Sequence, residues 1–130
     1  MDEPQWIADR SVLDIHDEQL QRHGGLAGVR DAGLLASALY RPRNLWNYAR
    51  DAADLSAMAA AYASGIARNH PFIDGNKRTA AVVCEAFIEL NGHLLIAGDD
   101  DWYNTMIGLA SGALTEEQLA DWIRSVLVAR

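Results

Sequence analysis

The chain has 130 residues, enough for one domain with a buried core and too few for two. Half of the residues are hydrophobic, a composition that excludes intrinsic disorder. The formal net charge of -7 argues against direct nucleic-acid binding, because clustered Lys and Arg side chains hold phosphate backbones. We therefore expect a single domain over residues 1–130.

The cysteine count and the hydropathy pattern bear on where the protein works. Cys84 is the single cysteine, which excludes a disulfide framework within the chain. Because it falls inside an apolar helical pattern, we interpret it as a buried, inert thiol. No segment approaches the roughly 20 apolar residues that span a bilayer, and the acidic N-terminus lacks a signal-peptide run. We expect a cytoplasmic protein with no membrane partner.

The first quarter of the chain predicts two helices. Ser11 followed by Asp14 resembles a capping box for a first helix, which should run to the Gly24-Gly25 break. Asp31 should cap a second, shorter helix. Pro42 should end that helix, because the residue before a proline is pushed out of the helical region, and the stretch after it should be irregular.

The middle of the chain predicts a pair of helices joined by a polar loop. From Asp54, apolar residues fall at three- and four-residue steps, which predicts a third helix up to about Asn69. After the polar residues 70–78, the apolar pattern from Thr79 predicts a central helix that stops at Asn91-Gly92. The polar loop would thus feed a helix N-terminus, where unpaired N–H groups favour an anion.

The last third of the chain predicts two more helices. Residues 93–98 are apolar, but we expect this segment to be too short to support a sheet. Acidic residues at 99–101 suit the start of a fifth helix, and Thr115 with Gln118 forms a capping box for a sixth. The fifth helix should turn these side chains inward: Trp102, Tyr103, Met106, Ile107 and Ala110. The predicted fold class is all-α, a single compact bundle of about six helices.

Residues 70–78 concentrate chemically active side chains, reading His-Pro-Phe-Ile-Asp-Gly-Asn-Lys-Arg. A neutral imidazole is well matched to taking a proton from an attacking hydroxyl, which makes His70 the candidate general base. Asp74 can hold Mg²⁺ by one carboxylate while phosphates and water fill the other positions. The remaining histidines lack such neighbours and are expected to be structural or solvated: His16, His23 and His93.

The rest of this run suits phosphate binding. Gly75 lets the backbone approach a ligand closely, and Asn76 can donate its amide to a phosphate oxygen. Lys77 and Arg78 are candidate catalytic residues, because they can neutralise charge that develops during transfer. Phe72 is better explained as a core anchor that pins the loop than as a substrate contact.

The run resembles the signature of the Fic/Doc family, His-x-Phe-x-Asp/Glu-Gly-Asn followed by a basic segment. The likeness extends over nearly the whole chain and is greatest to the death-on-curing (Doc) toxin branch, which shares the Asn-Lys-Arg ending. This resemblance implies a small α-helical domain whose central loop binds a nucleoside triphosphate. It also implies that the histidine acts on a protein hydroxyl, with ATP as substrate and Mg²⁺ as cofactor.

Two positions differ from the adenylyl-transferring branch, whose motif continues Gly-Asn-Gly-Arg-x-x-Arg. Lys77 replaces the second glycine and Ala81 replaces the final arginine. The Doc-like ending implies a toxin kinase that transfers the γ-phosphate of ATP to a Ser/Thr hydroxyl, namely a threonine of elongation factor Tu, and so arrests translation. AMP transfer is the alternative enzymatic interpretation, and a non-catalytic antitoxin-binding module is a third.

The regulation of the protein is also suggested by the resemblance. No Ser or Thr in the chain is followed four positions later by Glu, which is the pattern of the family's self-inhibiting helix. The resemblance therefore implies restraint by a Phd-like antitoxin, whose disordered C-terminal segment folds as a helix into a groove. We expect that groove near Trp46, Tyr48 and the first helix.

Overall fold

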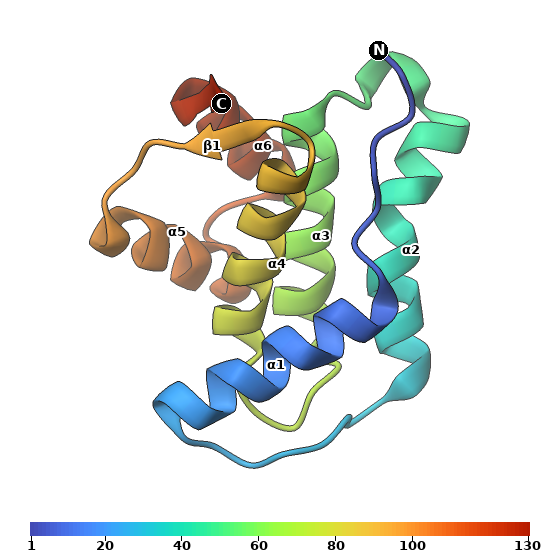
Figure 1. Ribbon diagram of the computed structural model, residues 1–130. Helices are drawn as coiled ribbons and strands as arrows, with labels where there is room; N and C mark the ends of the chain where they lie inside the picture. The colour runs from blue at the N-terminus through green and yellow to red at the C-terminus, as the bar shows by residue number, and fades with distance from the viewer.

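The computed structural model describes residues 1–130, which form six α-helices, one 3₁₀ turn and two short strands (Figure 1). The helices are α1 (Asp9–His23), α2 (Ala32–Tyr48), α3 (Leu55–Asn69), α4 (Asn76–Leu90), α5 (Asp99–Ser111) and α6 (Glu116–Val126). The 3₁₀ turn η1 is Arg50–Ala52, and the strands are β1 (His93–Leu95) and β2 (Leu127–Ala129). The predicted all-α class is confirmed. None of the helices combines the length and apolar character needed to cross a membrane.

The alanine-rich helix α3 lies at the centre and packs against α2, α4, α5 and α6. Small side chains let its neighbours come close. A Cβ added at Gly65 would lie only 2.9 Å from the Cα of Ala38 in α2. The core also holds Cys84 at 0% exposure, and this burial raises the pKa of its thiol well above the ordinary value. The thiol is therefore protonated and shielded.

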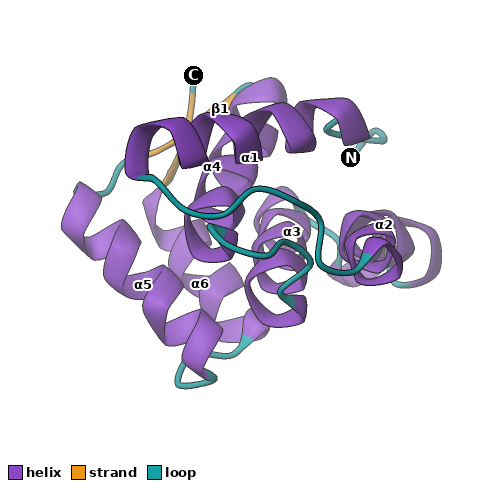
Figure 2. Ribbon diagram, turned by 90° about the horizontal axis from the view of Figure 1, so that it is seen from below, coloured by secondary structure: helices purple, strands orange, loops and turns teal.

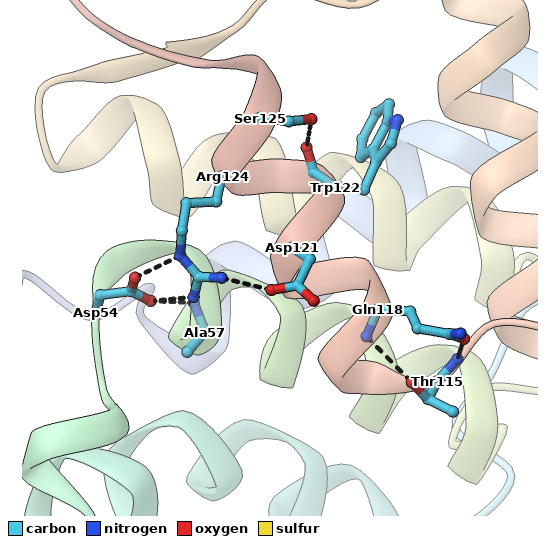
Figure 3. A network of polar contacts seen from close by, with 8 residues as sticks. All are labelled: Asp54, Ala57, Thr115, Gln118, Asp121, Trp122, Arg124 and Ser125. Atoms are coloured by element: carbon cyan, nitrogen blue, oxygen red, sulfur yellow. Dashed lines mark hydrogen bonds and ion pairs between the residues drawn. The ribbon is translucent and has the colours of Figure 1, made fainter.

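Side chains cap the starts of three helices, and two of these caps, at Asp31 and Thr115, were predicted. The Asp31 and Asp54 side chains accept backbone N–H groups in the first turns of α2 and α3. Thr115 and Gln118 form the predicted capping box at α6 (Figure 3). Asp54 also receives two hydrogen bonds from Arg124, so the start of α3 is tied to the end of α6.

The predicted capping box at the first helix is wrong. The helix begins at Asp9, with Ala8 as a cap that offers no side-chain hydrogen bond, and Ser11 lies inside it. The side chain of Asp14 is engaged by Arg10 at 3.3 Å instead of reaching back to the helix start. The start is set by tertiary packing, because Ile7 just before it is buried in the core.

The prediction that Pro42 ends the second helix is also wrong. Helix α2 runs through Pro42 to Tyr48, so the stretch expected to be irregular is mostly helical. A proline inside a helix removes one hydrogen bond and costs about 3 kcal/mol. Burial of Leu39, Pro42 and Trp46 on one face of α2 offsets this loss, because each large apolar side chain contributes roughly 1.5–3 kcal/mol.

Residues 93–98 do support a small sheet, contrary to the prediction. Strand β1 pairs antiparallel with β2, and Leu94 lies opposite Val128. The partner strand comes from the far end of the chain, where α6 ends at Val126 and the backbone becomes extended. A local reading of the segment could not anticipate a partner more than 30 residues away.

Candidate functional site

A cavity of about 270 Å³ opens between the end of α3 and the start of α4, and we call it the motif cavity. Its lining is mostly polar and includes six of the seven predicted site residues: His70, Asp74, Gly75, Asn76, Lys77 and Arg78. Ile73 and Tyr103 complete it. The structure therefore brings the candidate base, the candidate metal ligand and both cations to one place.

The backbone of His70 is unusual. It caps the C-terminus of α3 with φ 49 and ψ 55, and it is the one non-glycine residue of the structure with a positive φ. The side chain of Arg30 holds this turn, because its Nε donates to the His70 carbonyl at 2.6 Å and its Nη2 donates to the Asn69 carbonyl at 2.8 Å. The His70 side chain is exposed and lines the motif cavity.

The segment between α1 and α2, residues 24–31, lies along the motif loop (Figure 2). The Ile73 N–H donates to the Gly28 carbonyl at 3.0 Å, and the Arg30 N–H donates to the Pro71 carbonyl at 2.7 Å. Val29 and Phe72 form an antiparallel bridge between these two hydrogen bonds. The α1–α2 segment thus fixes the backbone of the loop that carries the site.

Asp74 is positioned by backbone groups. Its Oδ1 accepts the Gly75 N–H at 3.0 Å, and its Oδ2 accepts the Leu26 N–H at 3.2 Å. No group of three or more His, Cys, Asp or Glu side chains capable of holding a metal ion is present. A single exposed carboxylate fits a Mg²⁺ that arrives with nucleotide phosphates, since Mg²⁺ is commonly held by one or two carboxylates plus substrate.

The floor of the motif loop is made by buried side chains. Phe72 is 1% exposed, and its ring stacks on His16 with centroids 3.8 Å apart. His16, also buried, donates from Nε2 to the Asp74 carbonyl at 2.8 Å. This histidine is structural, as predicted, but its contact with the loop was not foreseen. The sequence signal for this contact was the spacing of Val12, His16 and Gln19, which places all three side chains on one face of α1. That face is the buried one.

The side chain of Asn76 is hydrogen-bonded to the motif loop. Its Oδ1 accepts the Phe72 N–H and its Nδ2 donates to the Phe72 carbonyl, both at 3.0 Å. The side chain is 9% exposed. The carboxamide therefore closes the loop on itself in this structure, where we had expected it to face a phosphate.

The start of α4 presents positive charge. The helix begins at Asn76, three residues earlier than its apolar pattern predicted, so Lys77 and Arg78 lie in its first turn. Gly75 is the N-cap with φ 77, no side chain caps the helix, and its first turn holds no acidic residue. Both cations are exposed and neither forms an ion pair. Unpaired N–H groups and two cations at one helix end favour an anion.

Tyr103 is the lining residue that the sequence did not suggest. It was predicted to face inward with Ile107, but the two side chains are 44% and 40% exposed, and Leu109 fills the core in their place. Tyr103 brings an aromatic ring from α5 to the motif cavity, where Ile73 is 50% exposed. The cavity thus has two apolar groups beside its polar and charged ones.

The chain is similar to known proteins of one family. The model of the Fic/DOC family matches residues 6–88, a stretch that includes every lining residue of the motif cavity except Tyr103. Protein kinase doc of Escherichia phage P1 is 30% identical over 118 residues, which cover 91% of this chain and 92% of that protein. Toxin Doc of Mycolicibacterium smegmatis is 45% identical over 78 residues, or 59% of each chain.

Proposed function

The chain belongs to the Fic/Doc family, and we propose that it is a Doc-like toxin that transfers the γ-phosphate of ATP to a Ser/Thr hydroxyl of a translation factor. The observation that carries this proposal is that His70, Asp74 and the two cations of α4 line one cavity. The name of the phage relative, a protein kinase, supports phosphate transfer, and elongation factor Tu is the target we would test first.

The proposed reaction uses few groups. His70 takes the proton of the attacking hydroxyl as its oxygen forms a bond to the γ-phosphorus, and ADP leaves with the electrons of the broken bond. Lys77 and Arg78, with the free N–H groups of α4, would stabilise negative charge on the transferred phosphate. Asp74 would hold a Mg²⁺ ion, which offsets phosphate charge when bound.

Two residues support transfer of the γ-phosphate over transfer of AMP. Ala81 is half-buried and packs against the core, so the second turn of α4 offers no further cation for an additional phosphate. Lys77 places bulk and charge where the adenylyl-transferring branch has glycine. Both features point to a triphosphate bound differently from that branch.

We also propose restraint by a Phd-like antitoxin whose C-terminal segment folds as a helix on this protein. The groove was expected near Trp46, but this side chain is only 6% exposed and Arg50 lies over its ring at 4.0 Å. Tyr48 is 86% exposed. Along the first helix, a groove of about 630 Å³ between α1 and α4 is lined partly by Trp6, Ile7 and Ile15, which supports this part of the expected surface.

The proposal is tested with ATP labelled at either the α or the γ position, incubated with the protein and purified elongation factor Tu, and in parallel with a translation extract. We expect label on protein only from the γ position, and no label with His70→Ala. His23→Ala is the matched control, because His23 is exposed at the end of α1 and lines no part of the motif cavity. It should retain activity.

The other outcomes separate the alternatives. Label transferred from the α position would replace the kinase assignment with AMP transfer. Absence of transfer from either position, with the wild type and His70→Ala behaving alike in the extract, would favour a binding module without catalysis. Labelling of an extract protein other than elongation factor Tu would keep the kinase and change its target.

A further inference from the structure

A second polar cavity, of about 320 Å³, lies between α2, α3 and the start of α6, and we call it the arginine cavity. None of its lining residues is hydrophobic, and none is shared with the motif cavity. The lining residues are Ser37, Arg41, Ser64, Gly65, Arg68, Asn69 and Glu116. Nothing in the proposed transfer reaction uses this cavity.

The arginine cavity contains a serine hydroxyl group with no hydrogen-bond partner in the protein. Ser64 is 6% exposed, and its Oγ makes no hydrogen bond within the protein although it lines the cavity. A serine inside a helix commonly satisfies its hydroxyl on a carbonyl of the preceding turn. Here the Ser64 hydroxyl is open to the cavity and remains available to a ligand that enters it.

The charges of the arginine cavity favour an anion. Arg68 has no carboxylate within ion-pair distance. Arg41 donates from Nε to Glu116 at 2.7 Å, and this hydrogen bond raises the pKa of Arg41, but its two terminal nitrogens have no protein partner. Two guanidinium groups and one carboxylate leave a net positive cavity on a protein whose formal net charge is -7.

We propose that the arginine cavity binds a phosphate group, either as inorganic phosphate or as the phosphate of a phosphorylated serine. Guanidinium groups pair with phosphate through two parallel hydrogen bonds, and a phosphate offers more acceptor oxygens than a carboxylate. The wholly polar lining has no place for a base or another large apolar group. This inference does not depend on the proposed kinase activity, because it concerns different residues.

The test is a titration of the isotope-labelled full chain, followed by the NMR shifts of its backbone amides. The ligands are inorganic phosphate and O-phosphoserine, with sodium chloride at matched ionic strength as the blank. We expect both ligands to move the amides of Ser64, Gly65 and Arg68. Phosphate that also enters the motif cavity will move a separate set around Lys77, and Lys77→Gln should weaken that second set alone.

Three variants sharpen the result. Arg68→Gln should weaken binding by about tenfold or more, because it removes a cation from the site, and Ser64→Ala by about threefold, because it removes one uncharged hydrogen-bond donor. Glu116→Gln should tighten binding several-fold, because it removes the carboxylate that competes for Arg41. If Glu116→Gln acted only by loosening the packing around the cavity, it would not tighten phosphate binding. Arg22→Gln, on the exposed face of α1, is the control for net charge.

Each outcome decides the proposal. Shifts with O-phosphoserine alone would identify a phosphorylated side chain as the ligand, and shifts with both ligands would include free phosphate; both results support the site. The proposal is overturned if the amides of Ser64 and Arg68 do not move, or if only the motif loop responds. It is also overturned if Arg22→Gln weakens binding as much as Arg68→Gln.

Discussion

The guanidinium of Arg30 donates to the His70 carbonyl at 2.6 Å, although the two residues are 40 positions apart in the chain. The same guanidinium donates to the Asn69 carbonyl, and the Arg30 backbone N–H donates to Pro71. One residue therefore holds three successive carbonyl groups at the turn where His70 has a positive φ. The direction of the candidate base depends on a side chain outside the motif.

Replacement of Arg30 by Ala should impair catalysis more than stability. The two side-chain hydrogen bonds are solvent-exposed, so we expect a loss of about 1 kcal/mol in the free energy of unfolding. A displaced His70 should lower kcat by about a hundredfold with little change in KM for ATP. Steady-state kinetics and urea unfolding test both. Arg10→Ala, an exposed arginine paired with Asp14, is the control. A raised KM with unchanged kcat would contradict this role.

Substitutions at the adjacent glycines Gly24 and Gly25 should differ in their effect on Asp74. A Cβ at Gly25 would lie 2.9 Å from the Asp74 Oδ2, and its φ is +123. Gly24 also has a positive φ, +77, but a Cβ there would meet nothing within 4 Å. Both Ala variants should lose about 1–2 kcal/mol to backbone strain. Only Gly25→Ala should also weaken Mg²⁺-dependent ATP binding, measured by calorimetry. Equal binding by the two variants would mean that the position of Asp74 does not matter.

Local chemistry explains which parts of the fold could be predicted. The cap at Asp31 and the box at Thr115 depend on neighbours within three residues, and both predicted caps are present. The errors at Pro42 and at strand β1 arise from tertiary contacts. In the first, burial of one face of α2 outweighs a lost hydrogen bond. In the second, a strand partner comes from the far end of the chain.

The candidate site shows the same division between local and distant information. The motif run predicted most of the cavity lining, because those residues are consecutive in the sequence. The contacts of three other residues with the site were missed, because these residues are distant from the motif in the sequence. Arg30 reaches the loop from the α1–α2 segment, His16 from α1 and Tyr103 from α5. The two hydrogen bonds that join the Asn76 side chain to Phe72 could be found only from the structure, because the sequence does not show how the loop closes.

Tyr103 should contribute to nucleotide binding through its ring. Because it lines the motif cavity and is 44% exposed, an incoming nucleotide can pack on it. We expect Tyr103→Ala to raise KM for ATP by about tenfold, the loss typical of an aromatic contact to a base, and Tyr103→Phe to behave as wild type. Ile107→Ala is the control, since Ile107 has similar exposure on the same helix but lies outside the cavity lining. A defect in Tyr103→Phe would assign the role to the hydroxyl.

The contribution of Asp54 to stability should depend on pH in a defined direction. Arg124 donates to its carboxylate from Nε at 2.7 Å and from Nη2 at 2.9 Å (Figure 3). The side-chain hydrogen bond to Arg124 lowers the pKa of Asp54 below its ordinary value, partly opposed by burial. The folded-state pKa is thus below the unfolded one. The stabilisation is therefore present above the unfolded value of about 3.9 and is lost as the pH falls through the folded value.

The variant Asp54→Asn isolates the charge of Asp54, because asparagine caps a helix about as well as aspartate does. At neutral pH we expect a loss of about 1 kcal/mol in the free energy of unfolding, since the pair is half-exposed and screened by solvent. The difference from wild type should shrink toward zero as the pH falls through the lowered folded-state pKa of Asp54, where the wild-type carboxyl takes up a proton. Urea unfolding followed by circular dichroism at several pH values measures it. Asp121→Asn, which removes the more exposed partner of Arg124, should have a smaller effect. The prediction would be contradicted if the difference in the free energy of unfolding grew on acidification, because the folded state would then favour the neutral form of Asp54.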